Sequence, residues 1–178
     1  MLKAIETTYQ GYRFRSRLEA RWAVFMDAAG VAWEYEKEGF DLGSVGPYLP
    51  DFWLPTIECW IEIKGQPATH HEIQKVQALA SAGGRPVVLF AGEIGPRMVG
   101  GIATDRWYPA AYTWASCSVC GWVDIIDIAA VRSIHCVTCK CPRWFRFTSP
   151  LLRNAYDAAR SARFEHGEQP TILHKAAS

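Results

Sequence analysis

The sequence predicts a mixed α/β fold in which a sheet lies between helices. Segments with helical spacing alternate with strand-like segments in the order helix, three or four strands, helix, strand. The chain has 178 residues, a length that suits one domain of ordinary size with a small appendage. Hydrophobic residues make up 49% of the chain and charged residues 21%, so it can bury a core and is not a disordered polymer.

The first helix is predicted from Ser16 to Ala29. Its apolar residues recur on one face, Ser16 and Glu19 have the S-x-x-E pattern of a capping box, and Gly30 supplies the stop. Strand-like segments follow, and the last two of them are bounded by Pro or Gly. These segments cover residues 31–36, 39–42, 48–54 and 59–64.

A second helix and a further strand complete the predicted core. Thr69 and Glu72 form another capping box, and the helix that they open stops at Gly83 and Gly84. The apolar run over 85–92 predicts a strand that is covered on both faces. The pair Ser149-Pro150 then has the N-cap and N1 pattern of a last helix, which is predicted to run to about residue 164.

Composition divides the chain into four segments. From residue 95 onward Gly, Pro, Trp and Tyr become frequent, and a cysteine-rich segment follows. The predicted organisation is therefore a core over 1–95, a connecting segment over 96–112, a cysteine module over 113–148, and a C-terminal helix with a polar tail over 149–178.

Charge is distributed unevenly, although the net charge is only +1. Residues 1–100 carry ten Lys and Arg against twelve Asp and Glu, whereas residues 101–178 carry nine against six. Any affinity for nucleic acid would therefore come from a local basic patch. The sequence contains no apolar run of signal-peptide or membrane-spanning length, so we expect a soluble, cytoplasmic protein.

The strongest chemical signal lies in the segment W-I-E-I-K-G over residues 60–65. Side chains alternate between the two faces of a strand, so Glu62 and Lys64 share a face with Trp60. Asp51 lies in the preceding strand-like segment, and the short turn over 55–58 allows it to approach Glu62. Two carboxylates and a lysine are therefore expected to converge on one spot.

Such a cluster suits a hard divalent cation, because carboxylate oxygens are ligands for Mg²⁺ and a phosphate oxygen can replace one of its waters. Lys64 could then orient or deprotonate an attacking water, or neutralise charge that builds up on a phosphate. The alternative is a solvated Glu-Lys pair with an exposed turn aspartate. The order of P-D and E-x-K, their apolar flanks and Gly65 favour the active-site interpretation.

The pair Pro50-Asp51 followed by Glu62-Ile63-Lys64 resembles the PD-(D/E)xK nuclease superfamily, which has the restriction-endonuclease-like fold. The segments R-S-R-L-E-A-R-W, W-E-Y-E, Y-L-P-D-F-W-L and I-E-I-K-G are similar to those of small nucleases of that superfamily from phages and bacteria. The resemblance spans roughly residues 10–95. It implies a mixed sheet flanked by helices and a metal-dependent endonuclease, which in the phage case would act in the host cytoplasm.

The resemblance also implies roles for individual residues. Asp51 and Glu62 would bind Mg²⁺ or Mn²⁺ together with the backbone carbonyl of Ile63, and Lys64 would be the catalytic lysine. Glu19 matches an acidic residue that many members carry on the first core helix near the metal, although the capping box alone also explains it. Many nucleases of this fold pair two active sites, so a homodimer is an option, but no interface pattern marks one.

Polar residues at the start of the second helix have two interpretations. The pairs His70-His71 and Gln74-Lys75 could assist at a phosphate site, or they could lie on a solvated helix face.

Five of the six cysteines lie between residues 117 and 141. Two C-x-x-C pairs separated by fifteen residues predict two zinc knuckles that complete a closed, structural Zn²⁺ site. Cys141 or His135 could replace one of the ligands. The predicted ligands are Cys117, Cys120, Cys136 and Cys139.

The C-terminal part is locally basic, with seven Lys and Arg against one acid over residues 132–163. Arginines alternate with aromatic residues there, and Tyr156 joins a basic stripe on the last helix, a pattern that suits phosphate contact with stacking on bases. The alternative is a zinc ribbon packed by its own aromatics, with arginines that keep it soluble. The candidate nucleic-acid-binding residues are Arg143, Arg146, Arg153, Arg160 and Arg163.

These observations favour a Mg²⁺- or Mn²⁺-dependent nuclease acting on DNA, with a zinc module that assists substrate binding. A second hypothesis is a non-catalytic zinc protein that binds nucleic acid or a partner protein. A third keeps the nuclease and makes RNA the substrate, because residues that contact the phosphate backbone do not distinguish the sugar.

Overall fold

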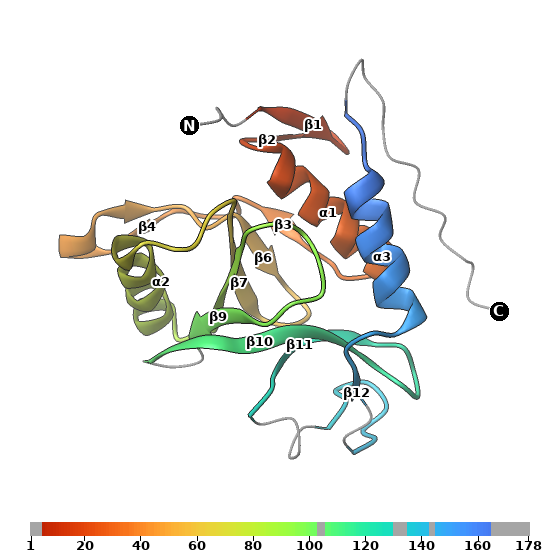
Figure 1. The fold of residues 1–178 in the computed structure, drawn as a ribbon. Coiled ribbons are helices and arrows are strands. Elements are labelled where there is room, and N and C mark those ends of the chain that lie inside the picture. Colours follow the sequence, from red (N-terminus) through yellow and green to blue (C-terminus); the bar gives the residue numbers. More distant parts are fainter. Residues whose placement is uncertain (1–4, 103–105, 130–134, 143–144, 165–178) are drawn as a thin grey trace.

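A computed structural model describes residues 5–102, 106–129, 135–142 and 145–164 of the chain. It confirms a mixed α/β fold in which helices flank a mixed sheet (Figure 1). The helices are α1 (Arg17–Ala29), α2 (His70–Gly83) and α3 (Pro150–Ser161). The sheet has eight strands: β3 (Glu34–Tyr35), β6 (Phe52–Leu54), β7 (Cys59–Lys64), β8 (Val87–Ala91), β9 (Val99–Ile102), β10 (Trp107–Cys117), β11 (Val123–Asp127) and β12 (Phe145–Arg146).

The strands follow the order β11-β10-β9-β8-β7-β6-β3, and β12 pairs with the end of β10. Only β7 and β8 are parallel among these pairs, because the chain crosses over between them through α2. Two small hairpins lie outside the sheet: β1 (Thr7–Tyr9) with β2 (Tyr12–Phe14), and β4 (Phe40–Asp41) with β5 (Pro47–Tyr48). A short 3-10 turn, η1 (Gly43–Val45), connects β4 and β5.

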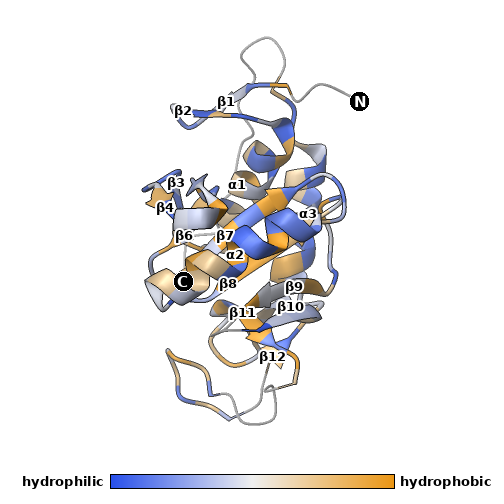
Figure 2. Cartoon of the chain, turned by 90° about the vertical axis from the view of Figure 1, so that its left-hand side faces the viewer, coloured by the Kyte–Doolittle hydropathy of each residue, from blue (hydrophilic) through white to orange (hydrophobic). Residues whose placement is uncertain are grey.

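The two faces of β7 and β8 bury different sets of side chains. Ile61 and Ile63 belong to the larger core cluster under α1 and α3, whereas Trp60 and Leu89 belong to the smaller cluster under α2. The alternation predicted for residues 59–64 is therefore confirmed, and it directs Glu62 toward the α2 side. The central strands are largely hydrophobic between the helices (Figure 2).

Capping residues set the ends of the helices much as the sequence predicts. The Ser16 hydroxyl accepts from the Glu19 N–H, and Thr69 and Glu72 form a complete capping box. Gly30 and Gly84 cap the C-terminal ends of α1 and α2, and their φ angles of 72° and 60° favour glycine. The last helix begins at Pro150 as expected, but it ends at Ser161 rather than near residue 164.

The stretch expected as a connection over residues 96–112 instead contains β9 and the first half of β10, which continue the sheet. Its glycines are required by packing. A Cβ atom on Gly100 would lie 2.2 Å from the Trp107 ring of β10, and one on Gly101 would lie 2.8 Å from the Tyr112 ring. The register of β9 and β10 shifts between Tyr108 and Tyr112, where Pro109 interrupts the pairing.

α3 packs in the main core against α1, although it follows the cysteine module in the chain. The ring of Tyr156 lies 4.5 Å from that of Phe25 and is only 3% exposed. The expectation that Tyr156 offers a surface for base stacking is therefore wrong, because burial of its ring stabilises the α1–α3 contact.

Two further departures concern short strands. The β1–β2 hairpin was not predicted; its two-residue turn places Gln10 and Gly11 at φ angles of 49° and 81°, as the tight hairpin turns require. The strand expected over 48–54 is interrupted, so that Asp51 lies in a bend directly before β6.

None of the described helices is both long enough and apolar enough to cross a membrane.

Candidate functional site

Asp51 and Glu62 are brought close together by antiparallel pairing of β6 and β7, in which Phe52 lies opposite Ile61. Both side chains are buried, with 3% of Asp51 and 4% of Glu62 exposed. Asp51 Oδ2 accepts a 2.6 Å hydrogen bond from the Ile63 N–H. The carboxylate directly before β6 is thus anchored to the backbone of β7, one residue from Glu62.

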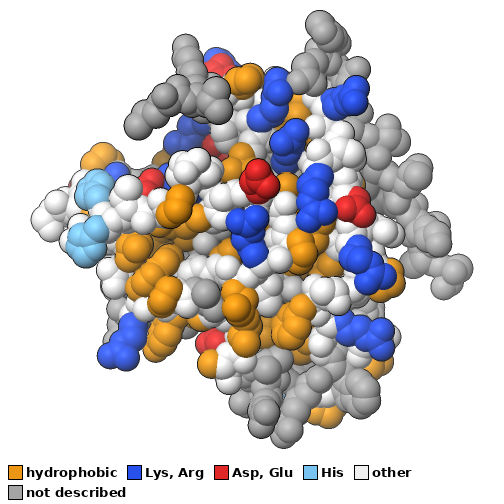
Figure 3. All heavy atoms as spheres, in the orientation of Figure 1, with side chains coloured by type: hydrophobic (Ala, Val, Ile, Leu, Met, Phe, Trp, Pro, Cys, Tyr) orange, Lys and Arg blue, Asp and Glu red, His pale blue; other side chains and the backbone are white. Residues whose placement is uncertain are grey.

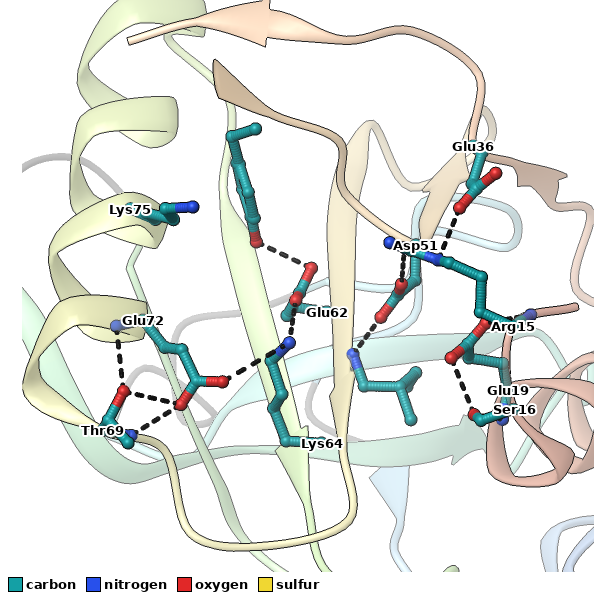
Figure 4. A network of polar contacts seen from close by, with 12 residues as sticks. Arg15, Ser16, Glu19, Glu36, Asp51, Glu62, Lys64, Thr69, Glu72 and Lys75 are labelled. Atoms are coloured by element: carbon teal, nitrogen blue, oxygen red, sulfur yellow. Dashed lines mark hydrogen bonds and ion pairs between the residues drawn. The ribbon is translucent and has the colours of Figure 1, made fainter. Parts of the chain in front are cut away.

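Lys64 completes the predicted cluster. Its Nζ lies 2.7 Å from Glu62 Oε1 and 3.5 Å from Glu72 Oε1. The other Glu62 oxygen, Oε2, accepts a 2.7 Å hydrogen bond from the Tyr48 hydroxyl. Figure 4 shows the resulting network, which extends from Glu72 on α2 through Lys64 and Glu62 toward Asp51 and α1.

Arg15 provides the cationic partner of Asp51. Its Nη2 lies 2.7 Å from Asp51 Oδ1, and its Nε lies 2.7 Å from Glu36 Oε1. Each of the two buried carboxylates, Asp51 and Glu62, therefore has its own basic partner, Arg15 and Lys64 respectively.

Glu19 is buried at the start of α1, with 7% of the residue exposed, and its contacts hold the chain at Arg15. Its Oε2 accepts from the Arg15 N–H at 3.1 Å and from the Tyr35 hydroxyl at 2.6 Å. Its Oε1 accepts from the Ser16 hydroxyl at 2.7 Å. Glu19 therefore helps to hold the start of α1, in line with the capping-box interpretation. It also contacts Arg15, which is the partner of Asp51, so it lies next to the candidate site.

The pKa values of both Asp51 and Lys64 are raised in this site. Burial raises the pKa of Asp51 well above its usual range, and the carboxylates of Glu62 and Glu19 raise it further, against the Ile63 N–H and Arg15. Burial alone would lower the pKa of Lys64, but Glu62, Asp51 and Glu72 outweigh it, so that pKa is raised. Lys64 is therefore a cation at neutral pH.

The raised pKa of Asp51 predicts a pH-dependent gain in stability for Asp51→Asn. The native state binds the Asp51 proton more tightly than the unfolded state, so the free energy of unfolding of the wild type falls as pH rises from about 4 to the raised pKa. The variant lacks this titration, and its amide oxygen can still accept from Ile63. We expect its stability advantage to grow over that interval by about 1.4 kcal/mol for each unit of pKa shift.

Thermal unfolding of protein prepared with zinc but without Mg²⁺ or Mn²⁺, followed from pH 5 to 8, measures this difference. If the difference in stability between the wild type and Asp51→Asn stayed constant with pH, the prediction would be wrong.

A pocket of about 380 Å³ opens beside these groups. It is lined on one side by β5 residues, including Tyr48, and on the other by α2 residues, including Glu72. Lys75 and His71 also line it, whereas His70 and Gln74 are exposed and are not among the lining residues. Lys75 lies near the β4–β5 hairpin, with Nζ 3.5 Å from the Pro47 carbonyl and 5.9 Å from the centre of the Tyr48 ring.

The cysteine module brings the four predicted ligands together. The Sγ atoms of Cys117, Cys120, Cys136 and Cys139 all lie within 4.8 Å of one another, so this group could hold a metal ion such as zinc. Within the described part of the chain, it is the only group of three or more Cys, His, Asp or Glu ligand atoms that is this compact. Among the described residues, the carboxylate oxygens of Glu19, Asp51 and Glu62 are not all this close to one another.

The two knuckles have the same backbone geometry. The N–H of Gly121 donates to the Cys117 carbonyl at 2.9 Å, and the N–H of Lys140 donates to the Cys136 carbonyl at the same distance. Gly121 and Lys140 both have positive φ angles, 79° and 58°. This equivalence favours Cys139 as the fourth ligand, because it occupies the position in its turn that Cys120 occupies in the other.

The alternative ligands lie outside the four-thiol group. Cys141 Sγ nevertheless lies 3.3 Å from Cys117 Sγ, closer than Cys139 Sγ at 3.6 Å, and His135 is exposed. Burial opposes ionisation of Cys117, but the N–H groups of Cys120 and Val119 lower its thiol pKa to about 6. Cys117 therefore ionises more readily to the thiolate, which is the form of cysteine that binds a metal.

The geometry of the knuckles predicts different effects for the two neighbouring cysteines. Cys141→Ser should retain one zinc per chain with affinity within about tenfold of the wild type, whereas Cys139→Ser should lose about 100-fold or more. Competition with a chromogenic chelator measures both affinities. The reverse order would make Cys141 the ligand.

The candidate nucleic-acid-binding arginines differ in their surroundings. Arg153 donates to the Thr148 carbonyl at 2.6 Å, and Arg160 donates to the Ile94 carbonyl at 3.2 Å, so both also hold the fold. Arg146 and Arg163 are exposed. Arg143 lies outside the described residues. Lys and Arg side chains gather over the α1–α3 side of the molecule (Figure 3).

Sequence reasoning did not assign site roles to several residues that the structure places there. Arg15 and Glu36 lie in the segments that carry the family resemblance, but their charges alone did not indicate a pair around Asp51. Glu72 was predicted only as a capping residue, and Tyr48 only as part of a strand. Tyr35 also lies in one of those segments, but its hydrogen bond to Glu19, 16 residues away in sequence, was not indicated by any local pattern.

Comparison with known proteins adds no assignment, since no protein family model, curated protein or solved structure matches this chain.

Proposed function

We propose that this chain is a metal-dependent nuclease that hydrolyses DNA phosphodiester bonds. One observation carries the proposal: two buried carboxylates, Asp51 directly before β6 and Glu62 on the adjacent strand β7, lie near a lysine, and Glu62 and that lysine, Lys64, line an open pocket. Burying carboxylates costs stability, and a buried carboxylate with charged neighbours at a pocket, as Glu62 is, is a candidate for a functional role.

The residues fit a hard divalent cation. Asp51 and Glu62 supply carboxylate oxygens, and like-charge repulsion among Glu62, Glu19 and Asp51 contributes to the raised pKa of Asp51, which bound positive charge would relieve. Asp51 and Glu62 would hold Mg²⁺ or Mn²⁺, and the family resemblance adds the Ile63 carbonyl. Such an ion supplies an activated water and charge stabilisation at the phosphate.

The remaining residues have roles that follow from their contacts. Lys64 is a cation at neutral pH, so its proposed role is to stabilise negative charge on the phosphate in the transition state, rather than to act as a base. Tyr48 orients Glu62 through the 2.7 Å hydrogen bond to Oε2. Glu72 keeps the Lys64 ammonium near the pocket from the α2 side.

The proposed substrate is DNA, a polyanion in which the scissile phosphodiester is flanked by further phosphates, and basic side chains that could contact those phosphates are available at two places. Lys75 lines the pocket itself, while Arg146, Arg153, Arg160 and Arg163 belong to the C-terminal basic segment. Contacts of this kind neutralise phosphates without reading the base sequence.

The test incubates zinc-loaded protein with supercoiled, linear and branched DNA and with RNA, with and without Mg²⁺ or Mn²⁺. We expect metal-dependent cleavage of DNA, and loss of cleavage in Asp51→Asn and Glu62→Gln. Cleavage of RNA in place of DNA would change the substrate class. No cleavage of any substrate by the wild type would refute the proposal.

A second candidate function is a non-catalytic zinc protein that binds nucleic acid or a partner. The four-thiol group and the basic side chains over α1 and α3 favour it, because neither needs the carboxylate pair. Metal-independent DNA binding that is unaffected by Asp51→Asn, together with absence of cleavage, is the result expected for that function.

A further inference from the structure

Arg15 lies beside Asp51 in the site and belongs to neither the predicted metal ligands nor the predicted basic segment. It sits between β2 and the first residue of α1, and its side chain lines the same pocket as Lys64 and Lys75. With 54% of the side chain exposed, its guanidinium reaches both the buried Asp51 and the solvent.

The backbone at Arg15 is fixed while its side chain has a choice of partners. The Arg15 N–H donates to Glu19 and also to the Tyr35 hydroxyl, each at 3.1 Å. The guanidinium hydrogen-bonds to Asp51 and forms an ion pair with Glu36, with a nitrogen–oxygen distance of 2.7 Å in each case. A guanidinium that gives up Asp51 would therefore keep Glu36 as a partner and remain at the mouth of the pocket.

Asp51 is the acceptor that Arg15 would have to share with a cation. Its Oδ2 is engaged by the Ile63 N–H, and its Oδ1 is the atom that Arg15 contacts. A divalent cation and a guanidinium compete for the same negative charge, and a guanidinium displaced from a carboxylate is well suited to a phosphate, whose oxygens it binds in the same forked geometry.

On this basis, and resting on the proposed nuclease function, we propose that Arg15 exchanges partners. In the cation-free protein it is the counter-ion of Asp51, and in the substrate complex it binds a phosphate of the nucleic acid while Glu36 retains its Nε. Glu19 is then a positioning residue that holds the backbone of Arg15 through the hydrogen bond from the Arg15 N–H.

The first experiment measures cation and DNA binding by Arg15→Gln in zinc-loaded protein. Calorimetric titration with Mn²⁺ should show about three- to tenfold tighter binding, because the competing guanidinium is gone. Fluorescence anisotropy with a duplex oligonucleotide in Ca²⁺ should show about 10- to 100-fold weaker binding, with the slope of log K against log salt reduced by about one. Arg13→Gln is the matched control, since Arg13 pairs with Glu6 on the surface, and it should change neither affinity.

The second experiment is a double-mutant cycle that needs no added Mg²⁺, Mn²⁺ or Ca²⁺. Asp51→Asn releases Arg15, so DNA affinity should rise by about three- to tenfold, and this gain should disappear in the Arg15→Gln background. A gain that persists without Arg15 would mean simple removal of charge repulsion and would overturn the proposal. Equal Mn²⁺ affinity in wild type and Arg15→Gln would overturn it as well.

These outcomes are separate from the test of nuclease activity. Opposite shifts in cation and DNA affinity without any cleavage by the wild type would support the exchange of partners and refute the nuclease. Cleavage by the wild type with unchanged affinities in Arg15→Gln would support the nuclease and refute the exchange.

Discussion

Replacing Lys64 by methionine should lower the rate of Mg²⁺-dependent DNA cleavage by about 10²- to 10⁴-fold. Methionine keeps much of the apolar stem and removes only the ammonium, which lies 2.7 Å from Glu62 Oε1 at the pocket. Because the neighbouring carboxylates raise the pKa of Lys64, the lost group is a positive charge across the neutral pH range. Initial rates of plasmid nicking measure the effect, and titration with Mn²⁺ shows whether the cation site survives.

Lys37→Met is a suitable control for this substitution. Lys37 is an exposed lysine that pairs with Glu34 at 3.4 Å and lies over the Trp53 ring, and it is not among the residues that line the pocket. Its replacement should leave cleavage within about twofold. If Lys64→Met cleaved within tenfold of the wild type, Lys64 would have no part in the chemistry.

Removal of zinc should destabilise the whole described fold, with a fall in the thermal midpoint of more than about 10 °C. Cys117 is the last residue of β10, the strand whose Trp114 packs on Phe25 and Phe90 in the main core. α3 follows the cysteine module and buries Leu152 and Tyr156 in the same core. Loss of the metal therefore loosens a core strand and the attachment of a core helix together.

Differential scanning calorimetry with Cys136→Ser, or with a zinc-selective chelator, tests this expectation, and near-ultraviolet circular dichroism reports on the buried tryptophans. Cys141→Ser serves as the control that keeps zinc. Two separate transitions, with the upper one unchanged by the loss of zinc, would mean that the core does not depend on the module.

The parts of the fold that could be predicted from sequence are those set by local rules. The caps at Ser16, Thr69 and Ser149 determine where the helices begin, and each side chain accepts the expected backbone hydrogen bond. The alternation in β7 is equally local, since it depends only on strand geometry and on burial of both faces. The convergence of Asp51, Glu62 and Lys64 followed from a short turn between neighbouring strands.

The parts that could not be predicted depend on contacts between distant segments. Gly100 and Gly101 look like linker residues in the sequence, and only the rings of Trp107 and Tyr112 explain why glycine is needed in β9. Tyr156 has the spacing of an exposed basic stripe, yet it faces Phe25 of α1. Arg15 is 36 residues from Asp51 in sequence, so no local pattern indicates their ion pair.

The position of α3 in the chain has a consequence for synthesis of the protein. Residues 59–91 form the strands and helix around the site, but the core beneath them is completed by a helix that begins at Pro150. A nascent chain that ends before Pro150 leaves the apolar faces of Phe25 and Trp22 without Tyr156. A ribosome must therefore translate the cysteine module before α3 can complete the main core, so that core closes only after the cysteines of the module have been made.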